Sequence, residues 1–328
     1  MIGPNPSERG AALLSVLLMV AILTVIAATT LDRLAIATKL SGNGNSLTQA
    51  RMFSYAVENL ASTRIEDLLA RDAAQTKLEG NWLGKEQVLP VPVGSASATV
   101  RDGANCFNLN SLVSETEGRY SPNSIGQEQM VSLMVVLGIN ESTARPVAAA
   151  ATDWADSDSI PSPNGAEDDS YRSAVTPYRT ANRLFAHPSE LRAVKGVTPA
   201  LYAKLRGWIC ALPEARLSPL NVNTLLPEQA PLLAMLFPPG QFSPVTARSY
   251  LAKRPASGYG SLIRFWGAPE MASIEASSPV QGQVKLTSTY FLLRTKVSLG
   301  ELILEGESML AATSGQVRLI WRSWGEQA

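Results

Sequence analysis

The sequence predicts an α+β fold, in which a long N-terminal helix packs on an antiparallel sheet and a large all-α domain is inserted into that sheet. Three observations support this prediction. Helical signal extends through residues 11–71. Strand-like segments occur twice, within residues 96–109 and 284–321. A block of short helices separates them, and this order favours one sheet that a helical segment interrupts.

The helix begins with residues 11–31, which contain no charged side chain. At ~1.5 Å per residue the segment is about 30 Å long, the thickness of a hydrocarbon core. The segment in front of it, residues 1–10, is short and polar and ends in Arg9-Gly10. No Ala-x-Ala-like cleavage site follows the apolar segment. This resembles a prepilin leader, which is cleaved in front of the apolar segment, here between Gly10 and Ala11. We therefore expect one membrane helix that the mature protein keeps.

Residues 32–71 continue the helix with a different pattern. Gly42 and Gly44 each weaken a helix by ~1 kcal/mol relative to Ala, so we expect a kink or local melting there. From Leu47 onward the apolar residues return to one face, which indicates packing on a sheet or a partner.

Short strands and helices follow. Strands are predicted at residues 96–101 and 106–109, and again at 284–297, 302–310 and 317–321. Helices are predicted at residues 128–137, 142–154, 189–194, 199–212, 227–236 and 244–253. The predicted parts are the leader (1–10), the membrane helix (11–31), the amphipathic helix with the first strands (32–110), the inserted α-domain (111–275) and the last strands (276–328).

Charge and composition argue against two functional classes. The 28 Lys and Arg residues balance 28 Asp and Glu residues, whereas nucleic-acid binders usually carry a basic excess. Nucleotide-binding, zinc-protease and hydrolase motifs are missing, and His187 is the only histidine. We predict a protein that is not an enzyme.

The chain contains two cysteines, Cys106 and Cys210. An even count favours a disulfide in an oxidising compartment. Two buried free thiols are the alternative, and counting alone does not decide between them.

An acidic segment is the strongest candidate for a functional site. Its six carboxylates lie within seventeen residues, around Pro161, Pro163 and Gly165, and repel one another unless a cation binds. Ca²⁺ takes six to eight oxygen ligands at ~2.3–2.6 Å and tolerates irregular loops. A solvated acidic loop is an equally good interpretation. The six residues are Asp153, Asp156, Asp158, Glu167, Asp168 and Asp169.

Residues 190–201 resemble a helix–hairpin–helix, a motif whose backbone N–H groups hold a DNA phosphate. Thr198-Pro199 replaces the second glycine of that hairpin. A structural corner between two helices therefore fits this neutral chain better than DNA contact.

Several motifs, taken in order, resemble the type II secretion system protein K family, the large minor pseudopilins. They are Arg9-Gly10-Ala11, Cys106-Phe-Asn-Leu-Asn110, Asp153-Trp-Ala-Asp-Ser-Asp158, Gly165-Ala-Glu-Asp-Asp-Ser-Tyr171, Glu190-Leu-Arg-Ala-Val-Lys-Gly196 and Leu220-Asn-Val-Asn-Thr224. The resemblance implies a pilin-like helix and sheet with an inserted α-domain that binds calcium. It makes the six carboxylates of the acidic segment the expected calcium ligands.

Ser15 departs from the usual pilin pattern. After cleavage behind Gly10 it would be the fifth residue, where most pilin-like subunits carry Glu. A carboxylate in a bilayer is costly unless it is paired, and its expected partner is the N-terminal ammonium of the subunit ahead. A subunit with Ser15 cannot supply that pairing, so it fits best at the tip of a filament.

The resemblance also implies the partners and the location. These are other minor pseudopilins in a tip complex, the major pseudopilin and the prepilin peptidase, with secreted substrates and the outer-membrane channel as further contacts and no nucleic acid. The chain would be methylated at its N-terminus, anchored by one helix in the inner membrane and mostly periplasmic, and would support export across the outer membrane. The alternatives are a membrane-anchored DNA-binding or DNA-uptake protein and a periplasmic hydrolase that uses the acidic loop.

Overall fold

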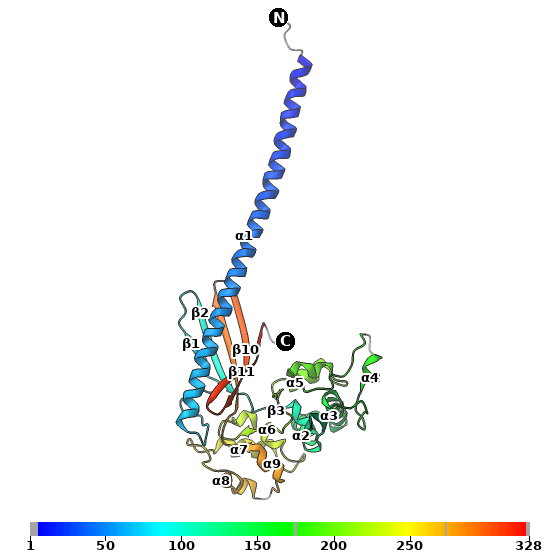
Figure 1. The fold of residues 1–328 in the computed structure, drawn as a ribbon, viewed down its shortest axis with the longest axis vertical. Coiled ribbons are helices and arrows are strands. Elements are labelled where there is room, and N and C mark those ends of the chain that lie inside the picture. The colour runs from blue at the N-terminus through cyan, green and yellow to red at the C-terminus, as the bar shows by residue number, and fades with distance from the viewer. Residues whose placement is uncertain (1–5, 174–175, 273, 326–328) are drawn as a thin grey trace.

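A long helix stands out from a body made of a sheet and an inserted segment (Figure 1). The computed structural model describes residues 6–173, 176–272 and 274–325, with side chains from Leu13 onward. The long helix, α1 (Pro6–Arg71), carries the N-terminus far from the body. The predicted α+β class is confirmed.

The first half of α1 contains the one helical stretch in the described residues that is long and apolar enough to cross a membrane. Its large apolar side chains, from Leu13 to Leu40, are exposed. The hydroxyls of Thr24, Thr29 and Thr30 donate hydrogen bonds to carbonyls of the preceding turn. These polar groups are therefore satisfied within the helix, as a hydrocarbon environment requires.

The expected kink at Gly42 and Gly44 is wrong, because α1 runs through both residues without interruption. Two penalties of ~1 kcal/mol do not end a helix whose following turns are held by tertiary packing. That packing begins at Leu47, which contacts the core beneath the sheet.

The main sheet is antiparallel, in the order β1-β2-β9-β10-β11. Its strands are β1 (Gln87–Leu89), β2 (Ser95–Asp102), β9 (Tyr290–Leu299), β10 (Leu302–Thr313) and β11 (Gln316–Trp324). The second half of α1 covers one face of this sheet. Val57 and Ile65 of α1 are buried there with Leu293, Val297 and Leu304. Alternate residues of β9 and β10 face away from α1 and form the outer face of the sheet.

An ion pair fastens α1 to the last strand. Glu58 is 7% exposed, and its carboxylate accepts hydrogen bonds from the Arg322 guanidinium and from the Ser308 hydroxyl (2.7 Å). The Arg322 guanidinium also lies 4.4 Å from the ring centre of Tyr55. Helix and strand, 264 residues apart, are thus joined by one largely desolvated contact.

Glu58→Ala is expected to lower the free energy of unfolding by about 3 kcal/mol, because it leaves Arg322 without its carboxylate. The guanidinium is partly exposed, which keeps the loss at the lower end of what such a deletion costs. Denaturant unfolding measures the change. Asp67→Ala, at an exposed position on the same helix, is the matched control and should change little. Equal losses in the two variants would show that the ion pair has no special role.

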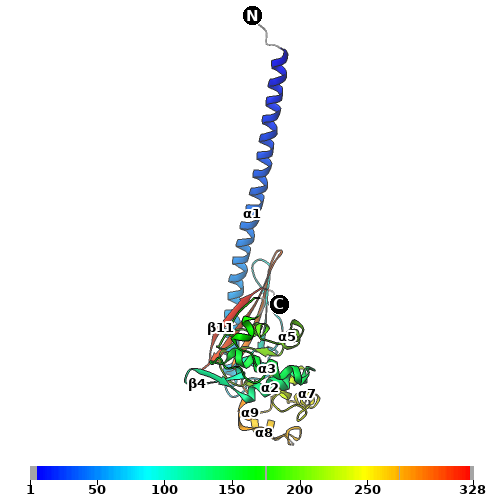
Figure 2. The ribbon, with the colours of Figure 1, turned by 90° about the vertical axis from the view of Figure 1, so that its right-hand side faces the viewer.

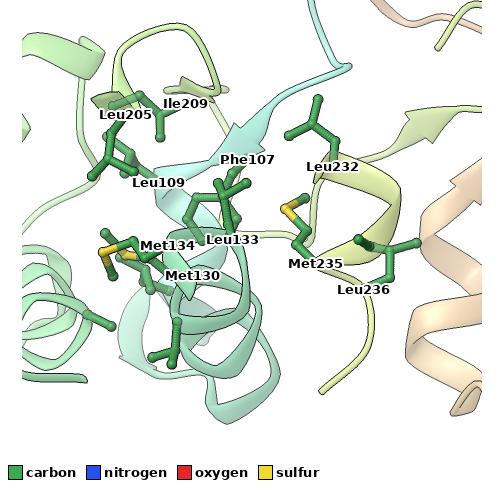
Figure 3. Close-up of a cluster of buried hydrophobic side chains, with 14 of the residues drawn as sticks. Phe107, Leu109, Met130, Leu133, Met134, Leu205, Ile209, Leu232, Met235 and Leu236 are labelled. Carbon is green, nitrogen blue, oxygen red and sulfur yellow. The ribbon is translucent and has the colours of Figure 1, made fainter. Parts of the chain in front are cut away.

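The inserted segment leaves the main sheet after Asp102 and returns at Tyr290, so it extends beyond residues 111–275 on both sides. It has its own core, in which side chains from β3, α2 and the surroundings of α6 gather (Figure 3). Figure 2 shows its helices α2, α3 and α5 in front of the sheet. Its elements are β3 (Phe107–Asn108), η1 (Leu109–Leu112), β4 (Val113–Thr116), β5 (Arg119–Pro122), α2 (Ser124–Val136), α3 (Glu141–Ala155), α4 (Asp168–Arg172), η2 (Pro188–Ala193), α5 (Pro199–Leu205), β6 (Ile209–Cys210), β7 (Leu220–Asn221), η3 (Pro227–Gln229), α6 (Ala230–Ala234), α7 (Pro244–Ala252), α8 (Leu262–Trp266), η4 (Pro269–Met271), α9 (Ser278–Gln283) and β8 (Val284–Lys285).

Three predicted elements differ in the structure, and several short ones were missed. The strand expected at residues 284–297 divides into β8, which pairs in parallel with β7, and β9, which begins at Tyr290. The strand expected at residues 106–109 pairs in parallel with β6 and does not join the main sheet. The helix expected at residues 199–212 ends at Leu205, because Gly207 follows and Trp208 then accepts a hydrogen bond from Phe107. The hairpin of β4 and β5 was missed. It turns at Glu117 and Gly118, both with positive φ, as a tight two-residue hairpin turn requires.

A buried polar network holds the insert where its chain enters and leaves the sheet. The Asp102 carboxylate accepts hydrogen bonds from the hydroxyls of Thr224 (2.6 Å) and Ser288 and from the backbone N–H of Ala104 (3.0 Å). Burial raises the pKa of Asp102, although these hydrogen bonds oppose the shift. The network thus joins the start of the insert (Ala104), its middle (Thr224) and its end (Ser288) to one carboxylate.

Candidate functional site

The acidic segment begins at the end of α3. Asp153 lies in the last turn of this helix, and Asp156 is its C-terminal cap. The backbone N–H of Asp156 donates to the backbone carbonyl of Thr152 (2.9 Å). Both side chains are buried, with exposed fractions of 0% and 1%. The helix therefore points two carboxylates into the protein, where only hydrogen bonds or a cation can compensate them.

Asp153 organises the loop that follows. Its carboxylate accepts hydrogen bonds from the backbone N–H groups of Ser162 (3.1 Å) and Ala166 (2.7 Å). A Cβ at Gly165 would lie 1.9 Å from Asp153 Oδ2, so only glycine fits there. These contacts turn the chain back on itself and bring Glu167 next to Asp156.

Three carboxylates form the resulting acidic cluster, namely Asp156, Asp158 and Glu167. Each contributes one oxygen, and these oxygens lie within 4.8 Å of one another. Asp156 Oδ1 and Glu167 Oε1 are buried and have no hydrogen-bond partner among the described residues. Asp158 is exposed and opens the cluster to solvent. No Lys or Arg in the described part of the chain forms an ion pair with any of the three carboxylates.

The electrostatics of the cluster favour a bound cation. Desolvation raises the pKa of Asp156 to about 7, and the neighbouring charges of Asp158, Asp153 and Glu167 add to the shift. Desolvation also raises the pKa of Glu167, although the Thr180 hydroxyl opposes this. Buried, unpartnered carboxylate oxygens are the donor set that a hard divalent cation such as Ca²⁺ takes.

The other three predicted site residues lie apart from this donor set. Asp153 already uses its oxygens to hold the loop. Asp168 accepts hydrogen bonds from the N–H and hydroxyl of Thr180 (both 3.0 Å) and pairs with Arg172 (3.1 Å). The Asp169 side chain is 96% exposed and pairs with Arg172 (3.2 Å). Neither Asp168 nor Asp169 is brought into the acidic cluster.

Two supporting residues were not found from the sequence. The Thr180 hydroxyl donates to Glu167 (3.1 Å), and the Asn182 side chain donates to the backbone carbonyl of Asp158 (3.2 Å). Both follow the acidic run by more than ten residues. No local spacing connects them to it.

Cys106 and Cys210 form a disulfide, with their Cα atoms 5.8 Å apart. It lies beside β3 and β6 in a small cluster with Leu212 of the insert and Met309 of the main sheet. The question that cysteine counting left open is thus answered by the structure. The bond sits where the insert meets the outer face of the sheet.

The hairpin within residues 190–201, which resembles a DNA-binding motif, makes its polar contacts within the protein. The N–H of Lys195 donates to the Tyr171 hydroxyl (3.2 Å), and the Lys195 ammonium donates to the Ser170 hydroxyl (3.3 Å). The N–H of Val197 donates to Val194 (3.1 Å). This arrangement favours a structural corner over a phosphate site.

Gly10, Ala11 and Ser15 all lie within α1, which begins before the predicted cleavage point. Ser15 is exposed among apolar residues. An exposed apolar half-helix, continued by a half that packs on an antiparallel sheet, defines a pilin-like protein.

The family follows from comparison with known proteins. Residues 105–214 and 220–287 match family models described as type II secretion system (T2SS), protein K. The chain is 32% identical to type II secretion system protein K of Klebsiella pneumoniae, over 98% of both chains. It is 31% identical to that of Pectobacterium carotovorum subsp. carotovorum, over 97% of both. The chain belongs to the type II secretion system protein K family, the minor pseudopilins, as the sequence motifs predicted.

Comparison with solved structures leads to the same family. The chain resembles one in the crystal structure of the GspK-GspI-GspJ complex from enterotoxigenic Escherichia coli, with a TM-score of 0.77 and 28% identity. The match covers 88% of this chain and 99% of that one.

Proposed function

We propose that the chain is a non-enzymatic subunit at the tip of a periplasmic pseudopilus, where it supports protein export across the outer membrane. The position of the insert carries this proposal. It occupies the end of the body opposite the N-terminus (Figure 1). In a fibre whose long helices run parallel, a further subunit would have to occupy that same end. Ser15 supports the same position, because it offers no carboxylate to the N-terminus of a subunit ahead.

The proposed partners are other minor pseudopilins, with the major pseudopilin below them. Support comes from the similar structure, which is a GspK-GspI-GspJ complex of a type 2 secretion system. The exposed apolar half of α1 also needs lipid or neighbouring helices to cover it. Prepilin peptidase would cleave between Gly10 and Ala11 and leave a methylated N-terminus, and the body would lie in the periplasm. Secreted substrates and the outer-membrane channel are the further proposed contacts.

We also propose that the acidic cluster holds Ca²⁺. Asp156, Asp158 and Glu167 would supply the ligands, and the buried unpartnered oxygens of Asp156 and Glu167 support this assignment. The ion would supply positive charge that these carboxylates lack, and so hold the loop after α3 in place. Its role would be structural.

Pseudopili sheared from cells test the tip position. An antibody against the insert is expected to label one end only, and N-terminal sequencing of the protein in the same material should begin at Ala11. Cells that lack the prepilin peptidase are the control and should yield protein beginning at Met1. Label spaced along the shaft, or a mature N-terminus beyond Leu31, would contradict the proposal.

A further inference from the structure

A groove of about 1090 Å³ separates the outer face of the main sheet from the insert. Its floor is formed by β2, β9 and β10, and its opposite wall by the end of α5 and the residues that follow it. At one side His187 of the insert meets Trp321 of β11, with ring centres 5.3 Å apart. The groove is larger than the roughly 300–1,000 Å³ of most small-molecule sites. Its size suits a segment of polypeptide.

The charges in the groove are unevenly matched. On its floor Arg294 pairs with Glu307 (2.7 Å), and Lys296 pairs with Glu305 (3.2 Å). The carboxylate of Glu228 pairs with Arg248 outside the groove (3.5 Å). The acids that line the groove are therefore largely neutralised.

Two arginines in the groove are left over. Arg101 of β2 lies on the sheet side and Arg206, just after α5, on the insert side. Both are exposed, and neither forms an ion pair within the described part of the chain. Glu86 is the one lining carboxylate there that has no ion pair or buried hydrogen bonds. The unpaired charge therefore sums to one positive charge, and two guanidinium groups are free to bind carboxylates.

Aromatic side chains complete the lining. Tyr202 and Trp208 belong to the insert, and Trp321 belongs to the sheet. Arg, Tyr and Trp are the residues enriched where protein surfaces bind other polypeptides. The composition of the groove thus agrees with its size.

We propose that this groove binds an extended, acidic segment of another polypeptide, whose carboxylates pair with Arg101 and Arg206. This inference rests on the proposed function, since it specifies one surface by which the subunit meets a partner. An extended segment suits the floor because alternate side chains of a strand point to one face. Acidic residues at every second position would all face the groove.

Fluorescence anisotropy tests the proposal with the full chain in detergent micelles. The probe is a labelled octapeptide of alternating Val and Glu, and its counterpart carries Lys in place of Glu. The Glu peptide should bind, and the R101E/R206E variant should bind it about tenfold more weakly or worse, since charged hydrogen bonds are lost. Arg264→Glu, at an exposed arginine outside the groove, is the matched control and should bind like the wild type.

Two results would overturn the inference, namely equal affinity for the Glu and Lys peptides, or equal affinity of R101E/R206E and R264E. The proposed function is tested separately by the antibody label on sheared pseudopili. R101E/R206E should still label one end only. Loss of peptide binding with retained end labelling therefore concerns the groove and leaves the tip position untouched.

Discussion

Removal of calcium with EGTA is expected to lower the melting temperature of the wild-type protein by about 5–10 °C. A ligand present at a hundredfold excess over its Kd stabilises the folded state by ≈ 2.7 kcal/mol. One kcal/mol of unfolding free energy corresponds to roughly 2–4 °C in melting temperature for a domain as large as the insert. Without the ion, the carboxylates of Asp156, Asp158 and Glu167 would face one another unneutralised. Thermal unfolding followed by circular dichroism measures the difference.

Two matched variants locate the effect. Asp156→Asn removes a buried oxygen of the cluster and should abolish the response to EGTA. Asp169→Asn changes a side chain that is 96% exposed and outside the cluster, and should keep the full response. The calcium assignment fails if EGTA leaves the wild-type melting temperature unchanged, or if the two variants respond alike.

The pH dependence in EGTA is a second readout of the same prediction. The pKa of Asp156 is about 7 in the folded protein, against 3.8 as the ordinary value. Because the folded state then binds more protons than the unfolded state, its stability falls as the pH rises from about 4 to 7. We therefore expect the EGTA-treated protein to melt at a higher temperature at pH 5 than at pH 8. The gap between the calcium-loaded and the EGTA-treated protein should widen toward pH 8.

Loss of the disulfide should be the largest single effect on stability. The bond closes a loop of 104 residues, and the chain-entropy model gives about 4.7 kcal/mol for a loop of that length. We expect the double variant C106S/C210S to lose about 4 kcal/mol of unfolding free energy and on the order of 10 °C in melting temperature. Denaturant unfolding with and without dithiothreitol measures this.

Reduction provides the internal control. Dithiothreitol should bring the wild type close to the double variant and should leave the double variant unchanged. Thiol titration of the unreduced, denatured wild type should find no free thiol. Two free thiols in that titration would refute the bond and, with it, the expected loss.

The sequence predicted the parts of the fold that have a clear signal over many residues. The apolar segment of α1 was recognisable from its length without a charge, and β9 alternates between more and less buried residues along its whole length. The two-residue strands β3 and β6 contain no period at all, and tertiary contacts alone define them. The continuity of α1 at Gly42 and Gly44 likewise depends on packing that begins several residues later.

The candidate site was predictable in its location but not in its membership. The density of carboxylates between Asp153 and Asp169 pointed to the right loop. Which of them meet depends on how Asp153 folds that loop and on how Arg172 draws Asp168 and Asp169 aside. Arg172 stands at the helical i, i+4 and i, i+3 spacings that a sequence can show, but the contacts of Asp153 have no signature in the local sequence. The same holds for Glu58 and Arg322, whose pairing spans almost the whole chain.

The insert joins the main sheet between two strands, β2 and β9, that are hydrogen-bonded to each other. Asp102 pairs with Phe291 across β2 and β9, and the N–H of Gly103 donates to Tyr290. The two strands are therefore already neighbours at the place where the chain departs and comes back. A short reverse turn in place of everything between them would leave the ladder of the sheet intact. The core between the sheet and α1 is built from those elements and their flanking loops and contains no residue of the insert, so the surface of the insert can diverge without changing that core.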